Sequence, residues 1–353
     1  MKVISVVGAR PQFIKLGPLS RELRKTHEEV IIHTGQHYDK EMSGLFFEQL
    51  EIPKPDINLE IGSGQHGEQT GKMLKGIEEV ILRVKPDLVL SFGDTNSTLA
   101  ACLAAAKLEV PSLHIEAGLR SFNRAMPEEI NRIVADHTAD LLFAPTKTAV
   151  SHLEHEGLGD RTVLTGDIMA DSVRFVQEKI KGSPYEGERY ALMTLHRPYN
   201  VDDPDKLSRL LQKFRHYPDK VVFPVHPRTR NIIRQNQIHI PAQVEIIDAQ
   251  GYIAFQRLLK HADKVITDSG GLQKEAYLAG KPCITLRPET EWVETVEAGW
   301  NVLMDINDEE LVEKISSFNP KHERPELYGT DVSVIMVSEM ERWLTRHNEK
   351  SIV

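Results

Sequence analysis

The feature that most constrains the fold of this chain is a repeated alternation between short apolar runs rich in β-branched residues and longer stretches of helical period. This alternation is typical of βα units arranged around a parallel sheet. Because the short runs are apolar almost throughout, we expect helices to cover both faces of each sheet. The sequence therefore predicts an α/β protein built from doubly wound parallel sheets.

The alternation comes in two series that meet near the GDIMAD stretch at residues 166–171. In the first series we expect strands at residues 2–7, 29–33, 88–92, 112–116, 141–144 and 162–164. In the second we expect strands at residues 190–194, 221–225, 244–247, 264–266 and 282–286. The helices predicted with most support lie at residues 13–25, 69–84, 97–108, 205–214, 252–261, 273–278 and 332–346. Two Rossmann-like domains are predicted, and a length of 353 residues suits two cores.

Charge and cysteine content narrow the class of protein. A net charge of −9 argues against a nucleic-acid surface built on bulk positive charge. Cys102 and Cys283 are far apart in apolar segments, so we expect two buried thiols and neither a disulfide nor a cysteine metal site. The amino terminus lacks the features of a signal peptide, and no segment has the length of a membrane helix. We therefore expect a cytoplasmic protein without a membrane or nucleic-acid partner.

Candidate binding segments follow the predicted strands, where ligands bind in this architecture, and we expect them to line a cleft between the two domains. GARPQFIK, residues 8–15, follows the first strand, and its Arg10 and Lys15 suit an anionic ligand. Its glycine allows a tight turn, and the alternative is a surface turn with two solvated cations. The segment is not a G-x-G-x-x-G dinucleotide fingerprint.

TDSGGLQKEA, residues 267–276, places a serine and two glycines immediately before a predicted helix in the second series. Backbone N–H groups at a helix start form an anion site suited to a diphosphate. Glu275 lies in the first turns of that helix, where its carboxylate suits a ribose diol. The alternative is an ordinary capped helix.

Acidic residues gather at strand ends of the first series. Asp94 lies in GDTNST, Glu116 in HIEAGLRS, and Glu128 and Glu129 in PEEINR. Carboxylates in a partly desolvated site can exchange protons with a substrate carbon or hydroxyl. Each acid alone also fits a cap or a solvated carboxylate, and Asp94, which precedes a helix, fits a cap in particular.

Three histidines, His114, His196 and His226, each follow an apolar run. A phosphate contact, a proton relay and a core imidazole all fit them, whereas their wide spacing disfavours a metal site. The chain has neither a G-x-S-x-G elbow nor a P-loop, so acyl transfer and nucleotide triphosphate hydrolysis have no support.

Taken together and in this order, GARPQFIK, TGQHYD, GDTNST, HIEAGLRS, PEEINR, TLHRP, PVHPRTR and TDSGGLQKEA resemble the non-hydrolysing UDP-N-acetylglucosamine 2-epimerase family. The resemblance covers essentially the whole chain. It implies the GT-B fold, with domains at residues 1–166 and 167–334, and a final helix at about residues 335–353 that returns to the first domain. It also implies a UDP-sugar substrate, a homodimer and a reaction without metal or nicotinamide.

The mechanism implied by the resemblance is elimination and re-addition. A base removes the proton at carbon 2 while UDP leaves carbon 1, and UDP then adds back to the 2-acetamidoglucal with protonation on the opposite face. Asp94, Glu116 and Glu128 match the acid/base positions of the family, and His196 matches a position that stabilises the departing diphosphate. The remaining implied contacts to UDP and the sugar are Ser269, Gly270 and Gly271 at the diphosphate, Glu275 at the ribose, Phe255 beside uracil, and Arg10, Lys15 and His226 at the phosphate and sugar end.

Two segments depart from the best-known bacterial members of the family. SFNRAMPEE and TEWVET resemble the branch that acts on UDP-2,3-diacetamido-2,3-dideoxy-glucuronic acid, although UDP-N-acetylglucosamine enzymes with SFNRxMPEE also occur. UDP-N-acetylglucosamine is the first expectation for the substrate, and the diacetamido glucuronate is the alternative. An acidic sugar needs an extra cation, for which Arg120, Arg124 and Arg287 are candidates.

Some bacterial members bind UDP-N-acetylglucosamine as an allosteric activator, and Gln36, His37 and Gln69 fall in the corresponding segments. The basic neighbours of the bacterial pattern are replaced here, which argues against activation. Less favoured alternatives are a hydrolysing epimerase, a GT-B glycosyltransferase and a sugar-nucleotide sensor without catalysis. The presence of all the acids argues against the sensor.

Overall fold

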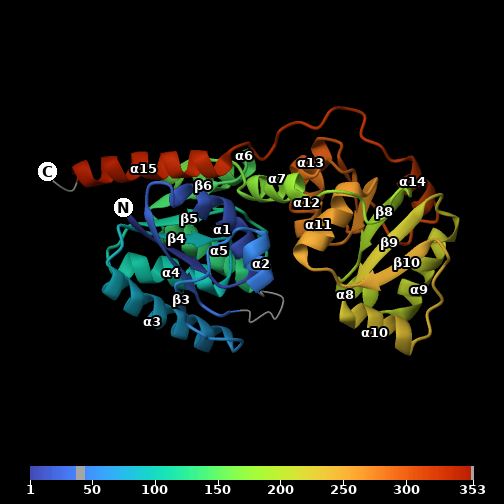
Figure 1. The fold of residues 1–353 in the computed structure, drawn as a ribbon, viewed down its shortest axis with the longest axis horizontal. Coiled ribbons are helices and arrows are strands. Elements are labelled where there is room, and N and C mark those ends of the chain that lie inside the picture. The colour runs from blue at the N-terminus through green and yellow to red at the C-terminus, as the bar shows by residue number, and fades with distance from the viewer. Residues whose placement is uncertain (37–43, 351–353) are drawn as a thin grey trace. The chain divides into compact units, whose positions relative to one another are not determined.

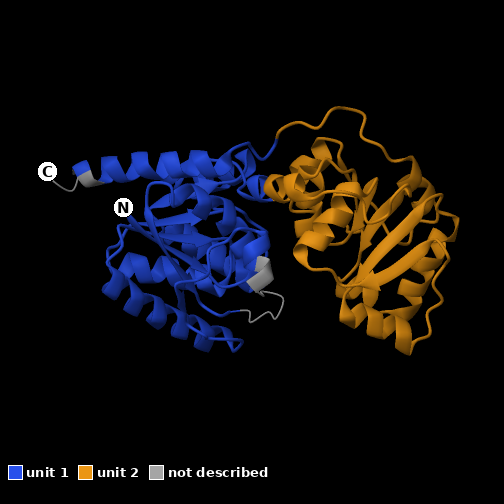
Figure 2. Cartoon of the chain, viewed as in Figure 1, with its two compact units in different colours: residues 1–172, 327–353 blue, residues 173–326 orange. Residues whose placement is uncertain are grey.

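The computed structural model describes residues 1–36 and 44–350. The chain divides into two compact units (Figure 2). The first contains Met1–Ser172 and Leu327–Val353, and the second contains Val173–Glu326. Among the described residues, no helix combines the length and the apolar character needed to cross a membrane.

The first unit is a parallel sheet of seven strands in the order β3-β2-β1-β4-β5-β6-β7, with helices on both faces (Figure 1). The strands are β1 (Lys2–Val7), β2 (Glu28–His33), β3 (Ile57–Asn58), β4 (Leu88–Phe92), β5 (Ser112–Ile115), β6 (Leu141–Ala144) and β7 (Thr162–Leu164). The helices are α1 (Arg10–Leu23), α2 (Gly44–Gln49), α3 (His66–Val84), α4 (Asn96–Lys107), α5 (Pro127–Thr138), α6 (Lys147–His155) and α15 (Val332–Lys350).

The second unit is a parallel sheet of six strands in the order β10-β9-β8-β11-β12-β13. The strands are β8 (Tyr190–Thr194), β9 (Lys220–Val225), β10 (Val244–Asp248), β11 (Lys264–Thr267), β12 (Cys283–Thr285) and β13 (Asn301–Leu303). The main helices are α8 (Pro198–Val201), α9 (Pro204–Lys213), α10 (Pro227–Gln235), α11 (Tyr252–His261), α12 (Gly270–Leu278), α13 (Val293–Glu297) and α14 (Leu311–Ser317). The chain enters this unit through α7 (Met169–Lys179), and η1 (Gly159–Arg161) and η2 (Phe214–His216) are single 3₁₀ turns.

The final helix α15 belongs to the first unit and packs against α1. Its start is held by Asp171, whose carboxylate accepts hydrogen bonds from Val332 N at 3.2 Å and from Ser333 N at 2.8 Å. A carboxylate at a helix start satisfies free N–H groups and complements the helix dipole. This cap explains why the chain up to Ser172 and the last helix form one unit.

The predicted strands are all present, and the core of each sheet consists of the apolar runs from which they were predicted. The sequence did not predict β3 and β13, which pair at sheet edges over two and three residues.

Each sheet has one point where the chain reverses its winding direction. In the first unit this point lies between β1 and β4, and in the second it lies between β8 and β11. The loops that leave adjacent strands in opposite directions open a crevice at the carboxyl edge of such a sheet. The two predicted binding segments, GARPQFIK and TDSGGLQKEA, follow β1 and β11.

Candidate active site

The loop after β1 lies directly against the loop after β4. A Cβ atom added at Gly8 would lie 2.0 Å from Ser97 Oγ and 2.4 Å from Thr34 Oγ1. Gln12 joins the two loops, because its Oε1 accepts from Gly8 N at 2.7 Å and its Nε2 donates to Phe92 O at 2.6 Å. Glycine is therefore needed here for close approach of the two loops, and Gly8 has no positive φ.

Lys15 and Glu116 form an ion pair at this edge of the first sheet. The Lys15 side chain is 12% exposed and that of Glu116 is 9% exposed, so the pair is largely shielded from water. Glu116 has a φ of 72°, a left-handed conformation that is costly for a residue with a side chain and occurs at functional sites. Gly93 lies beside the pair, and a Cβ there would be 3.3 Å from Glu116 Oε2.

Asp94 does not cap α4, whose N-cap is Thr95. Its carboxylate instead accepts two hydrogen bonds from Arg132 on α5, from Nη2 at 2.6 Å and from Nε at 3.0 Å. Asn131 Nδ2 donates to the Asp94 carbonyl at 2.9 Å. Burial alone would lower the pKa of Arg132, but the charges of Asp94 and Glu129 raise it. The capping alternative is therefore wrong, and the sequence missed Arg132 as the partner of Asp94.

The two adjacent glutamates at the start of α5 have different surroundings. Glu129 is buried and accepts hydrogen bonds from Ser121 N at 2.9 Å and Phe122 N at 2.8 Å. Burial raises the pKa of Glu129, but these bonds and Arg132 together lower it below its usual range. Glu128 is exposed in the first turn of the same helix. Glu129 thus holds the SFNRAM loop, and Glu128 is the glutamate left accessible to a ligand.

His114 is a core imidazole. Its ring is fully buried, with Nδ1 2.6 Å from Asp136 Oδ1 and Nε2 2.6 Å from the Gly93 carbonyl. Arg120 Nη1 lies 2.7 Å from Asp136 Oδ2, and the same guanidinium binds Glu156. Arg120 is therefore a structural cation and not one for an acidic sugar.

The second unit places its candidate residues around the loops after β8 and β11. Ser269 is the N-cap of α12, where its Oγ accepts from Leu272 N at 3.4 Å, and the two following residues, Gly270 and Gly271, open the helix. His196 follows β8, and its Nδ1 lies 3.1 Å from Asp268 Oδ1. Asp268 itself is fully buried. The sequence singled out the TDSGG segment but did not assign a role to this aspartate.

Gly270 and Gly271 differ in what surrounds them. A Cβ at Gly270 would lie 1.9 Å from Glu291 Oε1, whereas a Cβ at Gly271 would meet no atom within 4 Å. Glu291 is held by Arg287, with Nη1 2.9 Å from Glu291 Oε2. Arg287 is thus ion-paired, and Arg124 is exposed in the SFNRAM loop.

The remaining predicted residues lie on, or directly before, four helices. Glu275 on α12 accepts a hydrogen bond from Gln256 on α11, and Phe255 packs against the core beneath that helix. His226 is the exposed N-cap of α10, where its Nδ1 accepts from Arg228 N at 3.2 Å. Arg10 is the first residue of α1.

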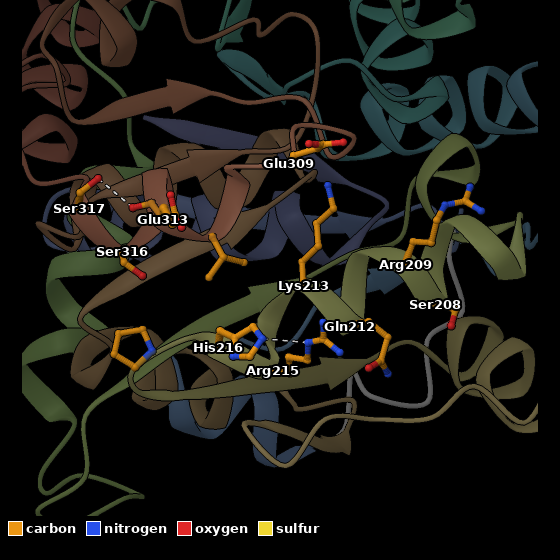
Figure 3. A pocket seen from close by; sticks show the side chains of 12 residues that line it. Ser208, Arg209, Gln212, Lys213, Arg215, His216, Glu309, Glu313, Ser316 and Ser317 are labelled. Atoms are coloured by element: carbon orange, nitrogen blue, oxygen red, sulfur yellow. Dashed lines mark hydrogen bonds between the residues drawn. The ribbon is translucent and has the colours of Figure 1, made fainter.

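A cavity of about 420 Å³ in the second unit lies at the carboxyl edge of the sheet and is lined by residues that include Asn200, Leu286 and Arg287. A larger cavity of about 1010 Å³ in the same unit runs along α9, η2 and α14 (Figure 3). The residues lining this larger cavity include none of the predicted site residues. Its Lys213 is engaged in the fold, because Nζ donates to Asp308 O at 2.6 Å and to Ile306 O at 3.0 Å.

Two of the three residues in the segments matching the allosteric site are used in packing. Gln36 Oε1 accepts from Ser97 Oγ at 2.7 Å, and Gln69 bridges Gly62 O and Asn96 Nδ2. His37 lies outside the described residues.

Comparison with known proteins relates the chain to one family. The profile of the UDP-N-acetylglucosamine 2-epimerase family matches residues 21–338. The chain is 49% identical over 335 residues to a UDP-N-acetylglucosamine 2-epimerase homolog of Methanococcus maripaludis. This alignment covers 92% of this chain and 94% of the relative. It is 48% identical over 324 residues to the UDP-2,3-diacetamido-2,3-dideoxy-D-glucuronate 2-epimerase of Pseudomonas aeruginosa. That alignment covers 89% of this chain and 91% of the enzyme.

A solved structure gives the same result. The UDP-GlcNAc 2-epimerase of Methanocaldococcus jannaschii, in complex with UDP-GlcNAc and UDP, matches with a TM-score of 0.83 and 39% identity, over 97% of this chain and 100% of that chain. The predicted fold, two doubly wound Rossmann-like domains of the GT-B type, is therefore confirmed. The chain belongs to the UDP-N-acetylglucosamine 2-epimerase family.

Proposed function

We propose that this protein epimerises carbon 2 of a UDP-2-acetamido sugar, by eliminating UDP to a 2-acetamidoglucal and adding it back. The observation that carries this proposal is the pair of carboxylates at the switch point of the first sheet, each beside a cation: Asp94 with Arg132, and Glu116 with Lys15. A carboxylate placed against the substrate can accept a proton from carbon as a base. Two such groups suit a reaction in which one removes a proton from one face of a carbon and the other adds a proton to the opposite face.

The proton balance of the proposed reaction is closed. One carboxylate takes the carbon 2 proton while the electrons of that bond form the double bond and those of the carbon 1–oxygen bond leave with UDP. In the return step the UDP oxygen bonds carbon 1, and a second group protonates carbon 2 from the other face. Asp94, Glu116 and Glu128 are the groups proposed for these transfers. The carboxyl group that has taken the carbon 2 proton then releases it to water, and the group that has protonated carbon 2 takes a proton back from water.

The second unit is proposed to bind UDP. The start of α12, with Ser269, Gly270 and Gly271, offers N–H groups and a positive dipole end to the diphosphate. Glu275 is proposed at the ribose, Phe255 beside uracil, and His196, His226 and Arg10 at the phosphates and the sugar. The proposed reaction is redox-neutral overall and needs neither a nicotinamide nor a metal. A homodimer is proposed from the family resemblance. A cytoplasmic location is proposed because both cysteines are buried free thiols.

UDP-N-acetylglucosamine is the first proposed substrate, and the diacetamido glucuronate is the second. The second has a specific observation in its favour, since exposed Arg124 projects from the SFNRAM loop that Glu129 holds in place. Incubation of the purified protein with each nucleotide sugar, followed by chromatographic separation of the epimers, tests the proposal. Conversion of one of them supports it, and an unchanged composition for both contradicts it.

Replacing Gly271 by alanine separates ligand binding from folding. Because a Cβ there meets no atom within 4 Å, the variant is expected to fold as well as the wild type, or to gain up to about 1 kcal/mol from the better helix former. If the diphosphate lies on this loop, the methyl group blocks its approach, and the Kd for UDP should rise about tenfold or more. Calorimetric titration with UDP and thermal unfolding measure the two effects.

The matched control is Gly67→Ala, which also adds a methyl group to open space near the start of a helix, in the first unit. It should leave UDP binding unchanged. Equal UDP affinity in Gly271→Ala and the wild type would show that the diphosphate does not bind at this loop.

A further inference from the structure

Asp268 is a buried carboxylate that joins the loops around the proposed diphosphate site. None of its surface is exposed, and it directly precedes Ser269, the N-cap of α12. Its Oδ1 accepts from His196 N at 3.1 Å, and its Oδ2 accepts from Arg197 N at 3.0 Å. Asn200 Nδ2 donates to the same Oδ2 at 3.0 Å. One carboxylate thus fixes the loop after β8 to the loop after β11.

These donors determine the ionisation of Asp268. Burial alone would raise the pKa of the carboxyl group, but the hydrogen bonds from His196, Asn200 and the Arg197 backbone lower it below its usual range. An ionised carboxylate offers acceptors only. Every group that faces Asp268 at hydrogen-bond distance must therefore donate to it.

This requirement fixes the proton on the His196 ring. Nδ1 lies 3.1 Å from Asp268 Oδ1, so Nδ1 carries a hydrogen and donates it. The other ring nitrogen, Nε2, is then the one that a ligand can use, and the side chain is 46% exposed. A buried carboxylate behind the ring favours the ring form that carries its hydrogen on Nδ1.

We propose that Asp268 is a positioning residue that holds His196 with Nδ1 protonated, so that Nε2 faces the ligand as a charged donor to the diphosphate. The inference rests on the proposed function in taking UDP as that ligand. The imidazolium offsets the charge that collects on the diphosphate as the carbon 1–oxygen bond breaks, and it keeps that oxygen in place for the return step. Asp268 acts on the reaction through His196, without touching the sugar.

Asn200 extends this arrangement to a third loop. The second hydrogen of its Nδ2 group reaches Leu286 O at 3.1 Å, immediately before Arg287. Asn200 supports Asp268 but binds Oδ2, whereas the His196 ring binds Oδ1. The two residues therefore allow the packing role of the carboxylate to be separated from its effect on the imidazole.

The test is Asp268→Asn. The amide oxygen must face Arg197 N and Asn200 Nδ2, which are donors, so the amide NH₂ group turns toward His196 Nδ1. Nδ1 then becomes an acceptor without a hydrogen, so that the ring is a neutral donor through Nε2. We expect kcat to fall about 10²-fold or more, with KM and the Kd for UDP within about threefold of the wild type.

The ring nitrogens themselves give the decisive readout. Nitrogen NMR of ¹⁵N-histidine protein, with His196→Gln to assign the signal, should show hydrogen on Nδ1 in the wild type and its loss in Asp268→Asn. The control Asn200→Ala should keep the wild-type signal and lose less than about threefold in kcat.

A wild-type His196 with hydrogen on Nε2 alone would overturn the proposal, even if Asp268→Asn fails to fold. So would an unchanged kcat in a folded Asp268→Asn protein. The wild-type spectrum is recorded without substrate, so it remains informative if neither UDP-sugar is converted. In that case the proposed function fails, whereas the structural part of the inference is judged by the spectrum alone.

Discussion

Replacing Asp94 by asparagine is expected to lower kcat about 10³-fold while the Kd for UDP stays within about threefold of the wild type. The amide keeps the shape of the side chain but cannot accept the substrate proton as a base. It also loses the charge that Arg132 binds through Nη2 at 2.6 Å and Nε at 3.0 Å. Most of the proposed UDP contacts lie in the second unit and none of them is Asp94, so affinity should not follow the loss of turnover. Steady-state kinetics and calorimetric titration with UDP measure the two quantities.

Asp87→Asn is the matched control, because Asp87 is an exposed carboxylate of the same unit that accepts a hydrogen bond from Lys2 N at 2.7 Å. It should change neither kcat nor UDP affinity appreciably. Near-normal turnover in Asp94→Asn would show that Asp94 takes no part in the proton transfer. A loss of UDP binding together with activity would make Asp94 a structural residue.

Replacing Asp136 by asparagine is expected to cost the largest amount of stability, about 3 to 5 kcal/mol of the free energy of unfolding. Asp136 is fully buried between His114, 2.6 Å away, and Arg120, 2.7 Å away. Its removal takes one of two carboxylates from the buried guanidinium of Arg120, which keeps Glu156, and leaves the buried His114 Nδ1 facing a neutral amide. Because His114 Nε2 also binds the Gly93 carbonyl, the change reaches the loop that carries Asp94. Denaturant unfolding of both proteins measures the difference.

Asp140→Asn is the control for this variant. Asp140 accepts a hydrogen bond from Ser112 N at 2.9 Å, a neutral donor, so its replacement should cost only about 1 kcal/mol. A similar loss in both variants would show that the charge of Asp136 contributes no more than a hydrogen bond.

The pH dependence of stability gives a second check on Asp136. Burial raises the pKa of this carboxyl group, but the charges and hydrogen bonds of His114 and Arg120 lower it below its usual range. The folded-state pKa is thus below that of the unfolded chain, so the stability from this group is complete above about pH 4 and is lost as the pH falls through the folded value. Asp136→Asn should lack this part of the acid destabilisation.

The strands could be predicted from the sequence because their burial leaves a continuous apolar run. VISVV in β1 and LVLSF in β4 are buried over their whole length. β3 and β13 were not predicted: β3 pairs over only two residues, within the mixed polar segment PDINLE, and β13 pairs over three. The order of strands comes from pairing between distant segments, such as β1 with β4, which local pattern does not encode.

The candidate site was predictable only in part for a related reason. Asp94 and Glu116 could be found because they follow apolar runs, but their partners lie far along the chain. Arg132 is 38 positions from Asp94, and Lys15 is 101 positions from Glu116. The two adjacent glutamates of PEEINR cannot be told apart by residue type, whereas the folded helix buries Glu129 and exposes Glu128. Tertiary contacts, and not residue type, separate these roles.

The central claim is that a carbon 2 proton is removed and replaced during epimerisation. Proton NMR of the purified protein with UDP-N-acetylglucosamine in deuterium oxide tests it most directly, with the diacetamido glucuronate analogue in a parallel sample. The account predicts that the 2-epimer of one substrate appears with deuterium at carbon 2. An epimer that keeps its original proton at carbon 2, or no change in either sample, would contradict it.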